Sequence, residues 1–522
     1  MSEYQKMQES QSITALVSEG VTPSVLPQTR TIFYFLLAFV VIFWTLVPIL
    51  GHHTPPLDVI EMTTWAQVPQ LGYYKHPPLP AWGIYLSELI FGRNSFALFI
   101  PSALSIGIAI LAVWPLALRF FGAKRGVIAL FLQSTLIYYN MYAPDYNHNV
   151  AQIPFWALTV SAFYFAVSDG RARYWIFFGA ALGVTTLSKY SAAFLPLACV
   201  VLLMWEKEAR RYLSVTNISL AAIAFFAVLG PHLFWLVKHD FAPIHYMNDR
   251  LGDLSLNASW SERFISYVGM QVLVHLVLIC VGVWCARGKH VQPDVNLNAP
   301  MASKVGRLNQ RFLWAMGLGP FAITVVLGLS GSYLHPMWAT AMFPLSGLIF
   351  VQLLSARIDV LWSPRWLIAW ILLMSFFGAI YAAKNTAGWH QLTNKYARAS
   401  YPGPELAREL DQKWRLAFPG KPLRFIVGTP WEAGVASFES SFDTRVLIEG
   451  DLTISPWISK NKLSNCGALV VWDPNVDMLT PLKRDWPQIR EQEQLSIIPD
   501  RANTFAALRL SWAIIPPQGN CN

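Results

Sequence analysis

The densest group of reactive side chains in this chain lies between Asp58 and Trp82. It holds two carboxylates three residues apart, Asp58 and Glu61, and the later run Gly-Tyr-Tyr-Lys-His-Pro-Pro-Leu-Pro-Ala-Trp, which contains Lys75 and His76. Carboxylates at i and i+3 lie on one face of a helix, where they can share a proton, a cation or an acceptor hydroxyl. The two prolines keep the preceding residues extended and stiff. This stretch is therefore the first candidate for a chemical centre.

Ordinary structural roles compete for the same residues. Asp58 could be a helix N-cap, Glu61 a solvated charge, and the aromatic residues a belt at the membrane interface. Position favours a functional role for Asp58, because it comes directly after an apolar stretch and the pair Pro55-Pro56, where a rigid helix end can aim it. Both roles stay open for Glu61.

Further polar residues stand at the ends of other apolar stretches. Asp145 follows an aromatic run, and a charge there is costly unless it is used or paired; its alternatives are a helix cap or a partner for Lys189. Lys189 could reach the same pocket from a hairpin of short spans, or snorkel to the headgroups. His232 and His275 are expected to be hydrogen-bonded core residues, whereas His335 is a candidate pocket residue.

A divalent cation is the one candidate cofactor. Its ligands would come from side chains of suitable type in and before the same stretch, namely His52, His53, Asp58, Glu61 and His76. No zinc-like spacing supports such a site, so the sequence leaves metal dependence open. No basic helix or aromatic RNA-binding motif accompanies the net charge of +9, which excludes a nucleic-acid partner.

The elements that position these residues are membrane spans. Hydrophobic residues make up 54% of the chain and charged residues 13%, against about 25% charged in soluble domains. A bilayer requires about 20 apolar residues per helix. Eleven uncharged stretches approach that length, approximately 31–50, 95–118, 126–143, 150–167, 174–187, 192–205, 218–236, 264–285, 312–329, 336–354 and 366–383. The fold class is thus an α-helical membrane protein of about eleven transmembrane helices.

Lys and Arg are unevenly distributed between alternate loops. Fifteen lie on one side and six on the other, which predicts a cytoplasmic N-terminus. Leu79 to Phe91 is too short to cross and is predicted to be a helix on the outer surface. The predicted domains are a cytoplasmic tail (1–30), a transmembrane domain (31–384) whose first outer loop is 51–94, and a periplasmic domain (385–522).

The last part of the chain has a soluble composition. Helical periodicity covers Glu405 to Leu416, and this part is predicted to be a small α/β or α+β domain. Four runs are predicted to be strands, Leu423 to Val427, Arg445 to Glu449, Ala468 to Trp472 and Ala506 to Ile515. Cys466 and Cys521 both fall in it, and a disulfide between them is one of two open alternatives in an oxidising compartment.

Taken together, the motifs resemble those of a known superfamily. They are the outer Asp-x-x-Glu, the following Trp and Gly-Tyr-Tyr-Lys-His-Pro-Pro run, Asp145-Tyr146, Leu187-Ser188-Lys189-Tyr190-Ser191 and Pro231-His232-Leu233-Phe234-Trp235. This order resembles bacterial glycosyltransferases of the protein O-mannosyltransferase and lipid A aminoarabinose transferase superfamily. The resemblance implies the multi-span GT-C fold and a polyprenyl-phosphate sugar donor used on the outer face of the cytoplasmic membrane. It covers the membrane part well and the external domain loosely.

The resemblance also implies roles for particular residues. Asp58 matches the loop acid assigned to the active site, and Glu61 and Asp145 are expected to act with it. Many relatives place an acid and a Lys before the prolines, where this chain has Lys75-His76, so a metal site that depends on that acid is in question. Outer-face cations expected to meet the donor phosphate are Lys75, His76, Lys189, Lys238, His239 and Arg250, with Tyr74 and His335 as further pocket residues.

A phosphate leaving group needs charge stabilisation more than protonation. Asp58 would therefore serve the acceptor: as a base for a hydroxyl, with inversion, or as an orienting group if the acceptor is a phosphate. The acceptor would be lipid A or lipopolysaccharide, another glycan or a protein. Rival functions are a lipid-linked-oligosaccharide ligase, a transporter or flippase, and a receptor; the spans carry no midplane carboxylate for ion coupling.

Overall fold

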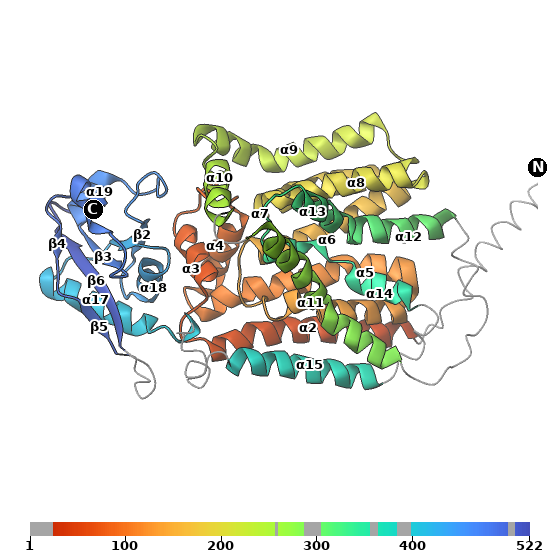
Figure 1. Ribbon diagram of the computed structural model, residues 1–522, viewed down its shortest axis with the longest axis horizontal. Coiled ribbons are helices and arrows are strands. Elements are labelled where there is room, and N and C mark those ends of the chain that lie inside the picture. Colours follow the sequence, from red (N-terminus) through yellow and green to blue (C-terminus); the bar gives the residue numbers. More distant parts are fainter. Residues whose placement is uncertain are drawn as a thin grey trace, which may run out of the picture.

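The computed structural model describes residues 25–255, 259–286, 304–354, 364–383, 398–498 and 507–521. Most of these residues form a helical body, and a small sheet unit lies at one end of that body, beside α3 and α4 (Figure 1). The predicted boundary at residues 384 and 385 lies outside the described residues, as does most of the predicted tail.

The helices of the body are mostly apolar. Their bounds are α2 Val25–Gly51, α5 Ser95–Ser134, α6 His148–Asp169, α7 Ala172–Ser188, α8 Phe194–Trp205, α9 Val215–Lys238, α11 Trp260–Ala286, α12 Lys304–Gly317, α13 Gly319–Leu329, α14 Ser346–Leu353 and α15 Pro364–Ala383. Short 3₁₀ turns connect them at η1 Ile137–Tyr139, η2 Tyr190–Ala193, η3 Glu208–Arg210 and η4 Pro336–Met342.

Six of the described helices are long and apolar enough to cross a bilayer, and eight spans result if two bent pairs count as one span each. The bent pairs are α12 with α13, at 41°, and η4 with α14, at 71°. The other three predicted spans correspond to the part of α5 beyond its break at Gly122 and to the shorter helices α7 and α8. The chain is thus a multi-pass membrane protein, and the count of eleven stays a prediction.

Two short helices follow the first span and face the sheet unit. Helix α3 (Leu57–Ala66) begins after Pro56, whose fixed φ suits a helix start, and seven of its ten residues are buried. Helix α4 (Leu79–Phe91) has the predicted bounds and ends at Gly92, which has the positive φ of 76° typical of a helix end.

The sheet unit begins at η6 (Arg398–Ser400) and combines parallel and antiparallel strands. Strand β1 pairs in parallel with β2 and β3, and β6 runs antiparallel to β3, β4 and β5. The elements are α17 Gly403–Ala417, β1 Phe425–Gly428, α18 Glu432–Glu439, β2 Arg445–Ile448, α19 Lys460–Cys466, β3 Ala468–Trp472, α20 Leu479–Asp485, β4 Arg490–Glu491, β5 Leu495–Ile497 and β6 Leu508–Ile515. The four predicted strands and the predicted helix are confirmed, and a disulfide joins Cys466 to Cys521.

Helix α18 of the sheet unit packs against α3. A side chain at Gly434 would meet Ile60 Cγ2 at 2.6 Å, so α18 and α3 pack at a distance that only glycine permits. Nearby, Thr54 Oγ1 donates to the Tyr401 carbonyl at 2.6 Å, and His53 Nε2 lies 3.0 Å from Glu405 Oε2. These contacts hold α3 between the helical body and the sheet.

Candidate functional site

A cavity of about 110 Å³ lies where α3, the start of α6 and the turn after α7 meet. Its walls come from five parts of the chain: α3, the segment before α4, the start of α6, the turn after α7 that carries Lys189, and η4. The lining residues are Asp58, Glu61, Met62, His76, Asn147, His148, Asn149, Lys189 and Trp338. Four residues predicted from the sequence are thereby brought together: Asp58, Glu61, His76 and Lys189.

Asp58 is held by an amide from α6. It occupies the first turn of α3, where the helix dipole favours a negative charge, and its Oδ2 accepts a hydrogen bond from Asn147 Nδ2 at 2.9 Å. Asn147 is itself fixed, because its Oδ1 caps α6 by accepting from the backbone N–H groups of Asn149 and Val150. The N-cap alternative for Asp58 is wrong, since the N-cap position is Pro56.

Lys189 faces Asp58 across the cavity. Its Nζ donates to Asn149 Oδ1 at 2.5 Å and lies 5.3 Å from the centre of the Trp338 ring. Gln152 of α6 fixes the turn by donating to the Lys189 carbonyl at 2.8 Å. Burial lowers the pKa of Lys189 to about 7, with the Asp58 charge opposing the shift. A second negative charge in the cavity, such as a phosphate, would restore the ammonium form.

The ring of His76 lies against the ring of His148 in the same cavity, with ring centres 3.8 Å apart and an angle of 39° between the ring planes. Burial, together with the charges of Lys189 and Lys75, lowers the pKa of His76 to about 3. The imidazole is therefore neutral near pH 7 and can meet a phosphate as a hydrogen-bond donor but not as a cation. His148 Nε2 is buried without a hydrogen-bond partner among the described residues.

Glu61 and Lys75 form an ion pair at the edge of this cavity. The Lys75 Nζ to Glu61 Oε1 distance is 2.6 Å, and the side chains are 19% and 13% exposed. Burial alone would lower the pKa of Lys75, but the Glu61 carboxylate raises it above its usual range. The alternative that Glu61 is a solvated charge is wrong. An ammonium group has three donors, so Lys75 can contact a second anion while it holds Glu61.

Asp145 lies close to Asp58 but does not line the cavity. Burial and the nearby Asp58 charge raise the pKa of Asp145 to about 8, while Arg398 opposes the shift. Its Oδ1 is buried without a hydrogen-bond partner in the described part of the chain. Asp145 is therefore mostly protonated near pH 7, which avoids a second negative charge beside Asp58.

The pKa shifts of Lys189 and Asp145 predict that any activity that uses this cavity declines at alkaline pH. Above pH 7 to 8, Lys189 loses its positive charge and Asp145 gains a negative one, so an anionic ligand should bind less well. We expect the apparent affinity for a lipid phosphate to fall between pH 7 and 9, by about tenfold per pH unit once Lys189 is neutral. Binding measured by isothermal calorimetry from pH 6 to 9 tests this expectation.

Lys189→Arg is the matched variant, because arginine stays charged over this range. Its affinity should fall less steeply above pH 7 than that of the unaltered protein. An affinity that is constant from pH 6 to 9 in the unaltered protein would show that the charges of Lys189 and Asp145 do not affect phosphate binding.

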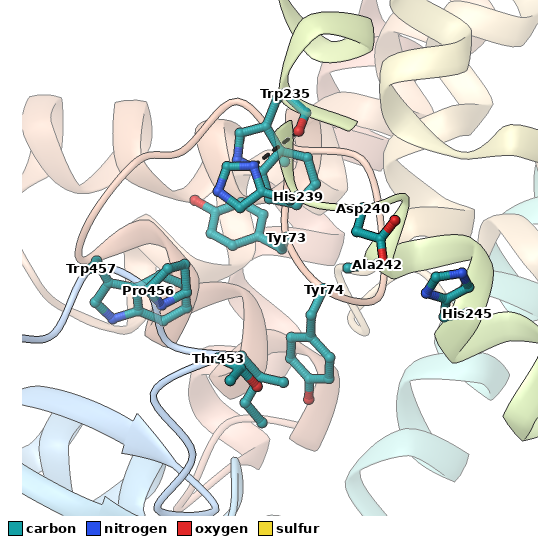
Figure 2. A pocket seen from close by; sticks show the side chains of 12 residues that line it. Tyr73, Tyr74, Trp235, His239, Asp240, Ala242, His245, Thr453, Pro456 and Trp457 are labelled. Atoms are coloured by element: carbon teal, nitrogen blue, oxygen red, sulfur yellow. Dashed lines mark hydrogen bonds between the residues drawn. The ribbon is translucent and has the colours of Figure 1, made fainter. Parts of the chain in front are cut away.

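The remaining predicted phosphate contacts and pocket residues lie outside this cavity. His239 and Tyr74 line a second cavity (Figure 2), while Lys238 is exposed at the end of α9. Arg250 is on helix α10 (Ala242–Ser255), and its side chain lies outside the described residues. His335 caps η4 next to Trp338, accepting from the Met337 N–H through Nδ1 at 3.3 Å.

The expectation that His232 and His275 are core residues is confirmed. His232 pairs with the Tyr190 hydroxyl at 2.9 Å and the Leu71 carbonyl at 2.7 Å. His275 pairs with the Gln271 carbonyl at 2.7 Å and with Ser346 Oγ at 2.9 Å.

Three of the five proposed cation ligands, Asp58, Glu61 and His76, line the same cavity, and His52 and His53 lie outside it. His52 pairs with the Tyr381 hydroxyl, His53 with Glu405, and Glu61 with Lys75. Within the described ranges, no group of three or more His, Cys, Asp or Glu side chains could hold a metal ion. A divalent cation therefore stays a prediction, and we derive no step through one.

Sequence reasoning missed the polar residues at the start of α6. Asn147, His148 and Asn149 each line the cavity, and Asn147 positions Asp58. A signal was present: an Asn before a long apolar run is a typical helix start, and three consecutive polar residues at a span end are unusual. Trp338 gave no such signal, because one tryptophan beside a span is common at membrane interfaces.

Comparisons with known proteins show which families this chain resembles. Residues 75–235 match the family described as dolichyl-phosphate-mannose-protein mannosyltransferase. The lipopolysaccharide core galacturonosyltransferase RgtB of Rhizobium johnstonii is 22% identical over 66% of this chain and 71% of its own length. The undecaprenyl phosphate-alpha-4-amino-4-deoxy-L-arabinose arabinosyl transferase of Pseudomonas savastanoi is 31% identical over 26% of this chain and 27% of that protein.

One solved structure covers almost the whole chain. ArnT from Cupriavidus metallidurans, bound to undecaprenyl phosphate, matches with a TM-score of 0.62 over 94% of this chain and 98% of its own. The identity is 13%, so this likeness concerns the fold. It extends across both the helical body and the sheet unit.

Proposed function

We infer that this chain, a GT-C glycosyltransferase, transfers a sugar from a polyprenyl-phosphate carrier to a cell-envelope acceptor. Its relatives act on lipopolysaccharide core or use undecaprenyl phosphate carriers, by their names. The observation that carries the inference is the cavity in which a carboxylate, Asp58, faces a cation, Lys189, at the ends of the helices. The cation suits the phosphate of a lipid-linked donor, and the carboxylate suits an acceptor hydroxyl that must lose its proton.

The proposed chemistry is a direct displacement at the anomeric carbon. One Asp58 oxygen is held by Asn147, and the other has no partner among the described residues, so it can accept the proton of an acceptor hydroxyl. The acceptor oxygen then bonds to the anomeric carbon as the carbon–oxygen bond to phosphate breaks. The polyprenyl phosphate leaves with the electron pair, and the configuration inverts.

Positive charge and hydrogen-bond donors would stabilise the leaving phosphate. Lys189 supplies an ammonium group within the cavity, Lys75 a second one at its edge, and His76 a neutral N–H. Such fixed donors stabilise developing charge more effectively in a site that excludes water. None of these three groups requires a metal ion for this role.

The membrane arrangement is part of the proposal. The basic loops predict a cytoplasmic N-terminus, and with eleven crossings the first outer loop and the sheet unit face the periplasm. Helix α4 supports this placement of the cavity near the bilayer surface, because Leu86, Leu89 and Ile90 on α4 are exposed apolar residues.

A transfer assay tests the function. Full-length protein in lipid nanodiscs is given synthetic undecaprenyl-phosphate sugars and purified lipopolysaccharide, and products are followed by mass spectrometry. We expect glycosylated acceptor and free undecaprenyl phosphate in equal amounts, with at least one of mannose, galacturonic acid and aminoarabinose as the sugar. Movement of an intact donor across the bilayer without loss of sugar would instead identify a flippase.

A further inference from the structure

A second and larger cavity, of about 330 Å³, opens between the helical body and the sheet unit. Figure 2 shows side chains from three places turned toward it: the segment before α4, the corner between α9 and α10, and the loop from β2 to α19. The lining residues are Gly72, Tyr73, Tyr74, Trp235, His239, Asp240, Ala242, His245, Thr453, Ile454, Pro456 and Trp457. Its size suits a ligand of one or two sugar rings, near the lower end of small-molecule sites.

The aromatic walls are fixed in place before any ligand binds. Tyr73 stacks on Trp65 with ring centres 4.8 Å apart, and it meets Trp457 edge-on at 6.0 Å. Trp235 stacks on His239 at 4.2 Å, and its ring lies where a side chain at Gly72 would be, 2.3 Å from the ideal Cβ. Rigid aromatic rings provide flat apolar surface at little entropic cost on binding.

Polar groups accompany these rings. The carboxylate of Asp240 is exposed and has no partner within the described residues, and His245 and Thr453 are exposed beside it. The indole N–H groups of Trp235 and Trp457 are buried and have no acceptor in the described part of the chain. Unused donors and acceptors beside aromatic surface are the combination that binds a polyhydroxylated ring.

The backbone at this corner is strained. Asp240 and Phe241 have φ values of 49° and 51°, and Glu449, at the start of the β2–α19 loop, has a φ of 53°. Residues other than glycine adopt this conformation at a cost that is typically retained at binding sites. Asp240 lines the cavity itself, and Phe241 and Glu449 belong to the segments that supply its other lining residues.

The two cavities lie on either side of one short segment. Tyr74 lines the larger cavity, Lys75 pairs with Glu61, and His76 lines the smaller one. The Lys75 ammonium lies 5.3 Å from the centre of the Tyr74 ring. Only the segment from Tyr74 to His76 separates a glycan in the larger cavity from the smaller one. A glycan that extends past this segment would bring a hydroxyl to Asp58.

We propose that the larger cavity binds the acceptor glycan, a neutral or amino-bearing sugar chain, beside the donor site. This inference rests on the proposed function. The charges favour the acceptor over the carrier phosphate, because Asp240 and the nearby Glu449 are carboxylates, and the Glu449 charge acts on both Glu61 and Tyr74. Sugar rings place their C–H faces on aromatic rings, and their hydroxyl groups pair with carboxylates.

Direct binding tests the proposal without catalysis. Full-length protein in nanodiscs is titrated calorimetrically with two probes, an uncharged hexose oligosaccharide of the lipopolysaccharide core and undecaprenyl phosphate. We expect Trp457→Ala and Asp240→Asn each to weaken oligosaccharide binding by about tenfold, with undecaprenyl phosphate binding unchanged. Trp457→Phe should retain most of the affinity, because it keeps an aromatic face.

The matched control is Asp249→Asn, an exposed carboxylate on α10 that does not line the cavity. It should bind both probes as the unaltered protein does. If the protein does not bind the oligosaccharide, or if Trp457→Ala weakens undecaprenyl phosphate binding instead, the proposal is wrong. Asp58→Asn should still bind the oligosaccharide, so loss of transfer and loss of acceptor binding are separable results.

Discussion

Replacing Asp58 by Asn should lower kcat for sugar transfer by about 10²- to 10⁴-fold, the range of a positioned general base. Asparagine keeps the size of the side chain and can still pair with Asn147, so the cavity should retain its shape. What disappears is the negative oxygen that accepts the acceptor proton. Initial rates with saturating donor and acceptor measure this effect.

The same substitution alters Lys189. The Asp58 charge raises the pKa of Lys189 against the effect of burial, so its removal should lower that pKa further. Donor affinity of Asp58→Asn should therefore match the unaltered protein at pH 6, where Lys189 is charged, and be weaker at pH 8. This pH dependence of the donor affinity distinguishes loss of a charge in the cavity from general misfolding.

Two controls accompany this experiment. Asp477→Asn changes an exposed carboxylate on the sheet unit, outside both cavities, and should leave kcat unchanged. Thermal unfolding in nanodiscs should be similar for both variants. A fully active and stably folded Asp58→Asn protein would exclude a role for this residue as the base.

The second large effect is expected at the ion pair of Lys75 with Glu61. Lys75→Met keeps most of the aliphatic stem but leaves Glu61 buried without its partner. Breaking a buried ion pair in this way lowers the free energy of unfolding by about 3 kcal/mol or more. The variant should therefore unfold at a lower temperature and at a lower denaturant concentration. Its donor affinity should also fall, because an ammonium group at the cavity edge is lost.

A double variant separates these two consequences. In Glu61→Gln with Lys75→Met no charge remains to be buried, so most of the lost stability should return. The donor affinity should stay low if Lys75 contacts the phosphate. Recovery of both stability and donor affinity would show that the pair is structural and that Lys189 alone serves the phosphate.

The amino-acid sequence was sufficient for features that depend on local pattern. Apolar stretches identified the membrane helices, the bounds of α4 were correct, and strand-like runs flanked by Gly, Pro and Asp located β1, β2, β3 and β6. Each of these elements follows from neighbouring residues through hydropathy and periodicity. The count of eleven spans stays a prediction, because three of the stretches form short or joined helices whose relation to the bilayer depends on their packing.

For the candidate site, the sequence identified the reactive types Asp58, His76 and Lys189. Only the tertiary structure decided their partners. Asn147 is 89 residues from the Asp58 that it holds, and Glu405 is 352 residues from His53. Contacts across such separations depend on how helices and sheet pack, because no local pattern records which distant side chain fills a hydrogen bond. The larger cavity arises in the same way, since its walls come from three distant segments that meet only when the sheet unit docks on α3.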